Sequence, residues 1–346
     1  MLYALRVASV LEEPGLSTGP AATETRCTAV VVSYNSASEL PACLEALASQ
    51  NGVQLQVEVV DNASRDGSAD LVRRFHPTVR VTETGANLGF ARANNIVLDQ
   101  TDAPFVALVN PDALLPPEAI STCIAALQEN PRLAIAGTRL VHEDGTLQPS
   151  CHAFLDLWNL LGETLLLDRA FPTWHSLSSL HMRDFAHDER REVDWIQGAF
   201  LVVRTDAIRA VGAFDPDYFM YGEEMDLCYR LHRAGWKTVF LPAPPVVHFG
   251  GASSRPIAGP MFVEVLKSRV RFLSKHRGPV AVLLGRVIIG LSVLWRAAAR
   301  WMQSLLVRLG GRPLPEPLAL RVRMFSAAAA WVLRGLPLDP YRPETR

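Results

Sequence analysis

Acidic and amide side chains end two apolar runs of the chain, and their types suit contact with a charged substrate. Asp61 closes the run VEVVD, and Asn110-Pro111-Asp112 closes the run FVALVN. A carboxylate at the carboxyl end of a strand can accept a hydrogen bond from a base or a ribose, or it can bind a hard cation. A divalent cation held by Asp112 would bridge to a diphosphate and stabilise its charge as it leaves. Taken alone, Asn110-Pro111-Asp112 is more often an ordinary turn, and Asp61 could equally be a helix N-cap.

A second acidic group, Glu223-Glu224-x-Asp226, stands at the start of a helical pattern. The helix dipole favours acids in a first turn, so capping is one explanation. The preceding residues FMYG are apolar and contain glycine, and a carboxylate in such a partly dry site has the raised pKa that suits a general base. Asp226 and Arg230 are four residues apart, which indicates a structural ion pair. Glu223 and Glu224 remain candidates for the base.

A histidine and a loop complete the candidates. His248 follows two valines and precedes Phe249-Gly250-Gly251, and an isolated histidine is more often structural than a ligand. The segment NLGFA, from Asn87 to Ala91, opens a helical pattern whose free amides can bind a phosphate. It has neither a Walker lysine nor a complete GxGxxG motif, so it is a weak signal by itself. The histidines between residues 150 and 190 lie in a stretch without a clear period and receive no role.

The elements that position these side chains are expected to form an open α/β sheet. From residue 27 to residue 110, apolar runs alternate with helical patterns of roughly ten residues, which predicts a mostly parallel sheet covered on both faces. Each polar loop follows a strand, so these loops meet at the edge where such sheets bind ligands. A hairpin is predicted at Glu143-Asp144-Gly145-Thr146. Residues 1–25 are expected to be a disordered leader.

The charge of the chain is divided unevenly. The 346 residues have a formal net charge of −1, yet residues 267–346 contain 15 Lys and Arg against 3 Asp and Glu. A basic end on an acidic body suggests an anionic partner, either membrane lipid or nucleic acid, although a solvated helix face is the simpler alternative. The five cysteines are far apart and odd in number, which favours a reducing compartment, the cytoplasm.

The C-terminal region has the pattern of a helix that lies in the plane of a membrane surface. From Pro279 onward it is apolar, interrupted by arginines, and has Trp295 and Trp301 near its polar boundary. No run of 18 uninterrupted apolar residues occurs, so no clean transmembrane helix is expected. The alternative is an ordinary helix packed on the rest of the chain or on a second subunit.

Five segments in this order resemble the inverting nucleotide-sugar glycosyltransferases of family 2, and especially their rhamnosyltransferase-like branch. The segments are VVVSYNS, VVDNASRDGS, NLGFARANN, LVNPDALL and the long stretch from WIQGAFLVVR through YGEEMDLCYR to VVHFGG. The resemblance implies the GT-A fold, a Rossmann-like, mostly parallel sheet flanked by helices, here with a C-terminal helical extension. It implies a glycosyltransferase domain at residues 26–255, with a variable insertion at 150–190, and a basic amphipathic tail at 256–346.

The resemblance also implies roles for residues. Around the donor nucleotide it places Ser33, Asn35, Asp61, Asn87, Gly89 and Asn94. Asn110 and Asp112 stand where relatives carry the DxD metal motif, and because its first position is Asn here, Asp112 is left as the principal carboxylate ligand, with His248 as a second metal ligand. Trp195 matches an aromatic residue on which an acceptor sugar stacks, and Asp226 is expected on the acceptor side. The base is Glu224, with Glu223 as the alternative.

The activity implied is transfer of a sugar from a nucleotide diphosphate-sugar to a hydroxyl of a glycan or polyprenyl-linked acceptor, with Mn²⁺ or Mg²⁺ as cofactor. Deoxythymidine diphosphate-rhamnose is the best single donor, and the inner face of the cell membrane is the expected location, in polysaccharide synthesis. A homo-oligomer is left open. The main alternative is a non-catalytic nucleotide-sugar or carbohydrate-binding protein on the same scaffold. A nucleotidyltransferase is disfavoured, because SYNSASELP is not a basic, glycine-rich loop, and no nucleic-acid partner is expected.

Overall fold

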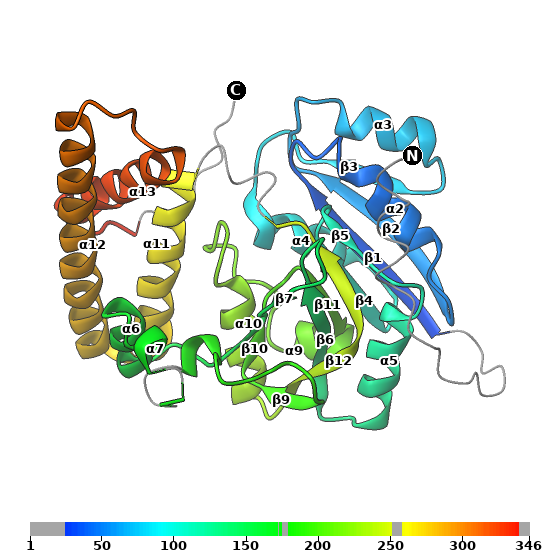
Figure 1. The fold of residues 1–346 in the computed structure, drawn as a ribbon. Helices are drawn as coiled ribbons and strands as arrows, with labels where there is room; N and C mark the ends of the chain where they lie inside the picture. The colour runs from blue at the N-terminus through cyan, green and yellow to red at the C-terminus, as the bar shows by residue number, and fades with distance from the viewer. Residues whose placement is uncertain (1–24, 172, 175–178, 251–257, 339–346) are drawn as a thin grey trace.

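The structure is a computed structural model that describes residues 25–171, 173–174, 179–250 and 258–338. It consists of a sheet domain and a group of long C-terminal helices at its side (Figure 1). The predicted leader, residues 1–25, lies outside the described residues except for Thr25, which begins the first strand.

The centre of the sheet domain is a single mixed sheet. The first four strands in the sheet order are parallel, the fifth runs antiparallel to both of its neighbours, and the seventh is parallel to the sixth. This confirms the predicted mostly parallel sheet. The order is β3 (Arg80–Glu83), β2 (Val53–Asp61), β1 (Thr25–Ser33), β4 (Phe105–Val109), β11 (Phe200–Arg204), β6 (Leu133–Val141), β12 (Lys237–His248), β5 (Ala113–Leu114).

Alternation of side chains along β1 explains why both faces of the sheet are covered. Val30 packs into one buried apolar cluster, while Ala29 and Val31 pack into another on the opposite face. Full burial of such an aliphatic side chain contributes about 1.5–3 kcal/mol, so helices on both sides are favoured. The helices of the N-terminal half are α2 (Leu40–Ala48), α3 (Ser68–Phe75), α4 (Gly89–Gln100) and α5 (Ala119–Glu129).

The predicted hairpin is present. Strand β6 pairs antiparallel with β7 (Leu147–Gln148) through a turn at residues 142–146. The region from 150 to 198 contains two short paired strands with helical turns between them: β8 (Cys151–His152), α6 (Leu157–Thr164), α7 (Leu167–Ala170), η1 (Ser179–His181), β9 (Arg191–Val193) and β10 (Trp195–Ile196). After β11 come α9 (Thr205–Ala210) and α10 (Glu223–Arg233).

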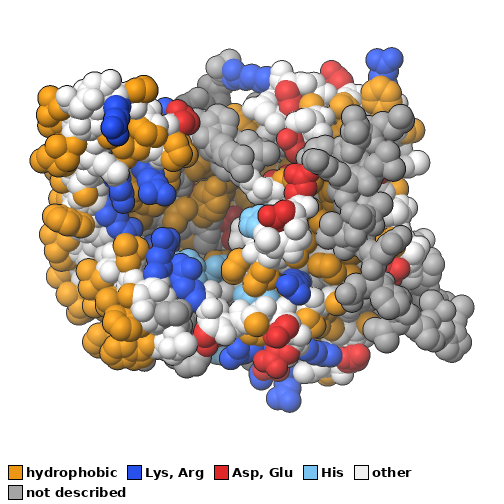
Figure 2. All heavy atoms as spheres, in the orientation of Figure 1, with side chains coloured by type: hydrophobic (Ala, Val, Ile, Leu, Met, Phe, Trp, Pro, Cys, Tyr) orange, Lys and Arg blue, Asp and Glu red, His pale blue; other side chains and the backbone are white. Residues whose placement is uncertain are grey.

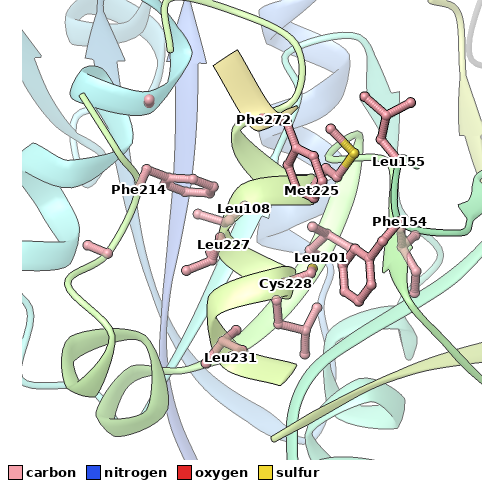
Figure 3. Close-up of a cluster of buried hydrophobic side chains, with 14 of the residues drawn as sticks. Leu108, Phe154, Leu155, Leu201, Phe214, Met225, Leu227, Cys228, Leu231 and Phe272 are labelled. Carbon is pink, nitrogen blue, oxygen red and sulfur yellow. The ribbon is translucent and has the colours of Figure 1, made fainter. Parts of the chain in front are cut away.

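The C-terminal extension is helical, as predicted: α11 (Ala258–His276), α12 (Gly278–Leu309) and α13 (Glu316–Leu333). Helix α11 packs into the core of the sheet domain. Its Phe272 is fully buried in the same apolar cluster as Met225 and Leu227 of α10 (Figure 3). The tail beginning at residue 256 therefore starts with a helix that is part of the sheet domain's core.

Helix α12 bears on the expectation that no clean transmembrane helix occurs. Among the described residues it is the one helix long and apolar enough to cross a membrane, judged by length and composition alone. The requirement for an uninterrupted apolar run missed it, because its arginines are spaced widely enough to leave a strongly apolar window. Only 22% of that window is buried, so most of its apolar surface faces outward.

Candidate active site

The carboxyl ends of β1 and β2 bring Ser33 and Asp61 together. The two residues are paired in the strand register, and the backbone N–H of Asn62 donates to the carbonyl of Ser33 at 2.8 Å. Asp61 Oδ1 accepts from Ser64 N at 3.0 Å. Asp61 Oδ2 and Ser33 Oγ are buried without a hydrogen-bond partner among the described residues. Because a buried unpaired polar atom costs about 1–3 kcal/mol, these two oxygens mark a place where a ligand would bond.

Asn35 connects the loops that follow β1 and β2. It has a positive φ of 51°, its backbone N–H donates to Ser64 Oγ at 2.9 Å, and its Oδ1 accepts from Arg65 N at 2.8 Å. Asp66 continues the connection by accepting from Ala37 N at 2.8 Å. The side-chain oxygen of Asn35 therefore positions the loop around Asp61.

The segment after β3 is anchored by Asn62, a residue that the sequence analysis did not select. Asn62 Nδ2 donates to Asn87 Oδ1 at 2.9 Å, and its Oδ1 accepts from Leu88 N at 2.8 Å. Gly89 has a φ of +80°, and a Cβ on it would lie 2.2 Å from the carbonyl oxygen of Phe219. Close approach of another backbone thus explains this glycine.

Asn94 does not fit its predicted contact with the donor. It is 1% exposed, and its Nδ2 donates to the carbonyl of Phe90, one turn earlier in α4, at 2.9 Å. The correction follows from helix geometry: Asn94 lies within the helix, on the side that is buried against the sheet domain.

Asp112 and His248 lie side by side, as predicted. Backbone pairing between β5 and β12 sets their positions, and Phe249 N donates to the carbonyl of Asp112 at 3.1 Å. Asp112 Oδ1 lies 3.2 Å from His248 Nε2, and Asn110 Nδ2 lies 3.3 Å from the same nitrogen. Gln148 of β7, which the sequence analysis missed, faces His248 Nδ1 through Oε1 at 3.1 Å.

This pair has the donor types and spacing of two adjacent metal ligands. Two ligands about 2.1 Å from an octahedral ion, at a right angle, are about 3.0 Å apart, close to the 3.2 Å between Asp112 Oδ1 and His248 Nε2. When Nδ1 of His248 carries its hydrogen, it donates to Gln148 and leaves the Nε2 lone pair facing Asp112. Within the described ranges no group of three or more His, Cys, Asp or Glu could hold a metal. At phosphate sites Mg²⁺ is usually held by one or two carboxylates together with phosphate oxygens and water.

Glu224 is held at the start of α10 by a glycine on another element. Gly198 N donates to Glu224 Oε1 at 3.1 Å, and a Cβ on Gly198 would lie 2.4 Å from that oxygen. Glu224 is half-buried, whereas Glu223 is 2% exposed and its Oε2 is buried without a partner among the described residues. Of the two candidates, Glu224 is the one that solvent can reach.

Burial raises the pKa of both glutamates. The pKa of Glu223 lies well above its ordinary value of 4.5, because the side chain is removed from water and because Glu224 is adjacent. The pKa of Glu224 is raised by the same removal from water, partly opposed by backbone hydrogen bonds such as that from Gly198. A carboxylate with a raised pKa is a stronger base, which suits proton abstraction from a hydroxyl.

The residues just before β11 join the metal-ligand pair to the base. Ala199 accepts from Asn110 N at 2.9 Å, and its neighbour Gly198 donates to Glu224. The loop after β4 and the first turn of α10 are thus connected through two hydrogen bonds to the adjacent residues 198 and 199. Figure 2 shows a hollow between the C-terminal helices and the sheet domain, with acidic and histidine side chains in it.

The two predicted acceptor residues lie in different surroundings. Trp195 is half-buried, stacks on His152 at 4.2 Å between ring centroids, and donates from Nε1 to the carbonyl of Ala153 at 3.0 Å. Asp226 is fully buried, and its carboxylate bonds to Arg230, Lys275 and His276. An acceptor contact by Asp226 is therefore wrong, and the structural ion pair with Arg230 is confirmed.

Solved structures of sugar transferases share this architecture. The mannosyltransferase PcManGT of Pyrobaculum calidifontis, solved with GDP-Man and Mn²⁺, superposes with a TM-score of 0.54 at 18% identity, covering 97% of this chain and 95% of that one. The structure of GalNAc-T7 with UDP, GalNAc and Mn²⁺ gives a TM-score of 0.52 at 11% identity, covering 90% of this chain and 56% of the other. The fold defines the chain as a GT-A protein.

Residues 28–183 match the family described as glycosyl transferase family 2. The N-acetylglucosaminyl-diphospho-decaprenol L-rhamnosyltransferase of Mycobacterium tuberculosis is 29% identical over 284 residues, which is 79% of this chain and 87% of that protein. The rhamnosyltransferase WbbL of Escherichia coli is 27% identical over 56% of this chain and 73% of its own length. The chain therefore contains a glycosyl transferase family 2 domain, and these relatives support its place in the rhamnosyltransferase-like branch.

Proposed function

We propose that the protein transfers a sugar, with rhamnose the first choice, from a nucleoside diphosphate-sugar to a hydroxyl of a lipid-linked glycan, with inversion. The observation that carries this proposal is the link from Asp112 and His248 through Asn110 and residues 198–199 to Glu224. The choice of rhamnose and of a lipid-linked acceptor follows from what the M. tuberculosis relative's name says it acts on.

In the proposed reaction Glu224 acts as the base. Its carboxylate takes the proton from the acceptor hydroxyl, and the hydroxyl oxygen forms a bond to the anomeric carbon on the face opposite the diphosphate. The bond from that carbon to the diphosphate breaks, and its electron pair leaves with the diphosphate. Asp112 and His248 would hold the divalent cation, which supplies positive charge to the leaving diphosphate. One carboxylate suffices, because no leaving sugar hydroxyl has to be protonated as in a glycosidase.

The nucleoside end of the donor would lie at Ser33 and Asp61. Their two unpaired oxygens, Ser33 Oγ and Asp61 Oδ2, are acceptors that suit a base N–H or ribose hydroxyls. Asn35 and Asn62 would keep the surrounding loops in place, because each bonds to the backbone of a neighbouring loop. Trp195 stays the proposed platform for the acceptor sugar.

The experiment that tests the base compares Glu224→Gln with Glu223→Gln in a transfer assay using deoxythymidine diphosphate-rhamnose. Loss of a general base lowers turnover by about 100- to 10,000-fold, so we expect this for Glu224→Gln with little change in donor affinity by calorimetry. Near-normal turnover of Glu224→Gln would contradict the assignment. Donor binding by the wild-type protein without any transfer or hydrolysis would support the non-catalytic alternative.

The metal is tested separately. Asp112→Ala should abolish the gain in donor affinity that Mn²⁺ or Mg²⁺ gives the wild-type protein. Thermal shift with and without the cation, over a panel of nucleotide-sugars, would measure that gain and identify the donor. Unaltered metal-dependent affinity in Asp112→Ala would refute the role of this carboxylate.

The location that accompanies this function is the inner face of the cell membrane, where α12 and its arginines would lie beside a lipid-linked acceptor. Support comes from the outward apolar surface of α12 and from the basic balance of residues 267–346.

A further inference from the structure

The helical part of the segment NLGFARANN contacts residues 211–222, which connect α9 to the helix of the base. Arg92 and Asn95 are three residues apart in α4 and therefore lie on one side of that helix. Asn95 Nδ2 donates to the carbonyl of Phe214 at 2.8 Å, and Phe214 N donates back to Asn95 Oδ1 at 3.1 Å. Arg92 Nε donates to the carbonyl of Pro216 at 2.8 Å. The amide side chain of Asn95 thus pairs with the backbone of this connection as a neighbouring strand would.

The first turn of α4 contacts the same connection further along. Phe90 N donates to the carbonyl of Phe219 at 2.8 Å. The rings of Phe90 and Phe214 meet edge to face, with 6.0 Å between their centroids. As α4 advances from Phe90 to Asn95, its contacts move back from Phe219 to Phe214, so the helix and the connection lie antiparallel. One side of α4 therefore holds most of the connection.

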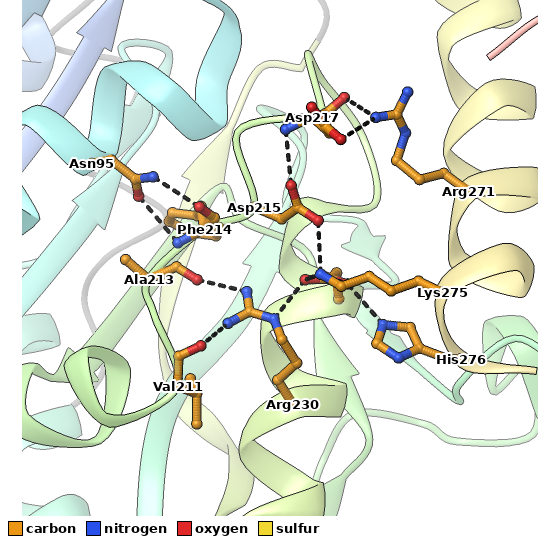
Figure 4. A network of polar contacts seen from close by, with 11 residues as sticks. Asn95, Val211, Ala213, Phe214, Asp215, Asp217, Arg230, Arg271, Lys275 and His276 are labelled. Atoms are coloured by element: carbon orange, nitrogen blue, oxygen red, sulfur yellow. Dashed lines mark hydrogen bonds and ion pairs between the residues drawn. The ribbon is translucent and has the colours of Figure 1, made fainter. Parts of the chain in front are cut away.

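Helix α11 holds the connection from the other side. Lys275 Nζ donates to Asp215 Oδ2 at 2.7 Å, and Arg271 lies 3.7 Å from Asp217 Oδ2. Figure 4 shows Asn95 on one side of the connection and Arg271 and Lys275 on the opposite side. Loss of the contacts from α4 would leave the connection held by α11 from one side.

The connection ends directly at the base. Tyr221 and Gly222 have φ values of 68° and 93°, and Glu224 follows in the first turn of α10. Left-handed backbone at a residue with a side chain persists where the surrounding contacts fix it. The direction in which α10 begins, and with it the position of the Glu224 carboxylate, therefore depends on how residues 214–219 are held.

The other end of α4 adjoins the proposed nucleoside site. Asn62 Nδ2 donates to the carbonyl of Gly89 at 3.2 Å, at the start of α4. Asn62 follows Asp61, whose Oδ2 is buried without a partner among the described residues. Helix α4 thus lies between the residues proposed for the donor and the connection that leads to the base.

We propose that Asn95 and Arg92 are positioning residues for the base. By holding residues 211–222 they set the place of the Glu224 carboxylate relative to the donor, which the residues beside the start of α4 are proposed to bind. The inference rests on the proposed function, because it takes Glu224 as the base. It assigns the helical half of NLGFARANN to the base and not to the donor.

The test places Asn95→Ala in the wild-type chain and in Glu224→Gln, and measures kcat with donor and acceptor in excess. In the wild-type chain we expect kcat to fall about 100-fold with donor affinity by calorimetry unchanged, because a displacement of about 1 Å at a catalytic group has this effect. In Glu224→Gln the same substitution should cause no further fall, since the side chain that it positions no longer takes the proton. A purely structural role would lower both backgrounds equally.

Arg92→Ala gives the same comparison with a milder change, because it removes one exposed hydrogen bond. We expect a fall of about tenfold in kcat, again only where Glu224 is present. If Asn95→Ala does not fold, this variant decides. The matched control is Asn130→Ala, whose Oδ1 accepts from the backbone of Arg132 at 3.0 Å at the end of α5. Its kcat should equal that of the wild type.

Equal losses in the two backgrounds would overturn the positioning role while leaving Glu224 as the base. Unchanged kcat in both Asn95→Ala and Arg92→Ala, or an equal loss in Asn130→Ala, would overturn it as well. Near-normal turnover of Glu224→Gln by itself would contradict the base, and this inference would fall with the proposed function.

Discussion

At the scale of single residues, the position of Glu224 depends on the absence of a side chain at Gly198. A Cβ there would lie 2.4 Å from Glu224 Oε1, a distance that requires the carboxylate to move. Gly198→Ala should therefore lower kcat by about 100-fold while donor KM changes little, because displacing a catalytic group by about 1 Å has this effect. Steady-state kinetics measure the split between the two constants.

The control is Gly310→Ala, where a Cβ would meet its neighbours at an ordinary 3.5 Å and the φ is −77°. Unchanged kcat in Gly198→Ala, with the melting temperature of the wild type, would show that Glu224 does not need this contact.

Glu223 gives a prediction about pH. Its pKa in the folded protein lies well above the ordinary 4.5, because of burial and then of Glu224. A raised folded pKa contributes stability that is present below about pH 4.5 and lost as pH rises through the folded value. Glutamine does not ionise, so Glu223→Gln does not lose this stability. Its melting temperature should therefore rise relative to that of the wild type as the pH increases from 5 to 8. Parallel curves of melting temperature against pH for the two proteins would contradict a buried Glu223 with a raised pKa.

The family resemblance was needed to select the carboxylates and the histidine of this candidate site, because Asp112, Glu224 and His248 taken singly also fit a turn, a helix cap and a structural histidine. Their partners were not predictable. Gln148 and Gly198 have no local signal, and their roles come from strands that meet only in the folded sheet. Asn94 and Asp226 were predicted to contact the donor and the acceptor, but their side chains bond to Phe90 and His276 of the protein itself.

At the scale of elements, a buried ion cluster joins the helix of the base to α11. Asp226 of α10 accepts from Arg230 at 2.7 Å and from His276 at 2.7 Å, while Lys275 lies 2.9 Å away (Figure 4). Burial by itself would raise the pKa of Asp226, but the bonds from His276, Arg230 and Lys275 outweigh it and lower the pKa to about 2. The cluster therefore holds α10, and with it Glu224, against the C-terminal helices.

Asp226→Asn should destabilise the protein by about 3–5 kcal/mol at neutral pH, because it leaves buried cations without their counter-charge. Since the folded pKa of Asp226 is depressed, its contribution is present above the ordinary 3.8 and is lost as pH falls through about 2. Urea unfolding at pH 7 measures the difference. Asp102→Asn removes an exposed ion pair with Arg26 and serves as the control, with little change expected. Equal midpoints for the two variants would show that the cluster does not stabilise the fold.

The alternation of strands and helices predicted the parallel half of the sheet and the hairpin, because local patterns determine both. The second half of the sheet was harder to predict from the sequence. Strand β11 inserts antiparallel between β4 and β6, and α11 enters the core. Both depend on pairing between distant segments, which no local period records.

At the scale of the whole molecule, the uneven charge predicted from the sequence corresponds to a division in space. The acidic part of the chain carries the candidate active site, and the basic part forms helices beside it (Figures 1 and 2). The sequence predicted the amphipathic helix but not its contact with α6, because the two helices are more than a hundred residues apart along the chain.

This division predicts that a substitution on α12 lowers the rate of transfer to an acceptor in a membrane but not to an acceptor in solution. Leu291 is 66% exposed and distant from the donor residues in the chain, so Leu291→Glu should leave the fold and donor binding intact. With an acceptor embedded in phosphatidylglycerol vesicles, transfer by this variant should fall about tenfold, because a charge on the apolar face weakens docking. With a short-chain acceptor that is soluble in water, its turnover should equal that of the wild type, because no docking is needed. The ratio of the two rates isolates the contribution of the surface from that of the active site. Equal losses on both acceptors would mean that α12 acts on the chemistry through the fold, and equal retention would mean that the bilayer contacts the protein elsewhere.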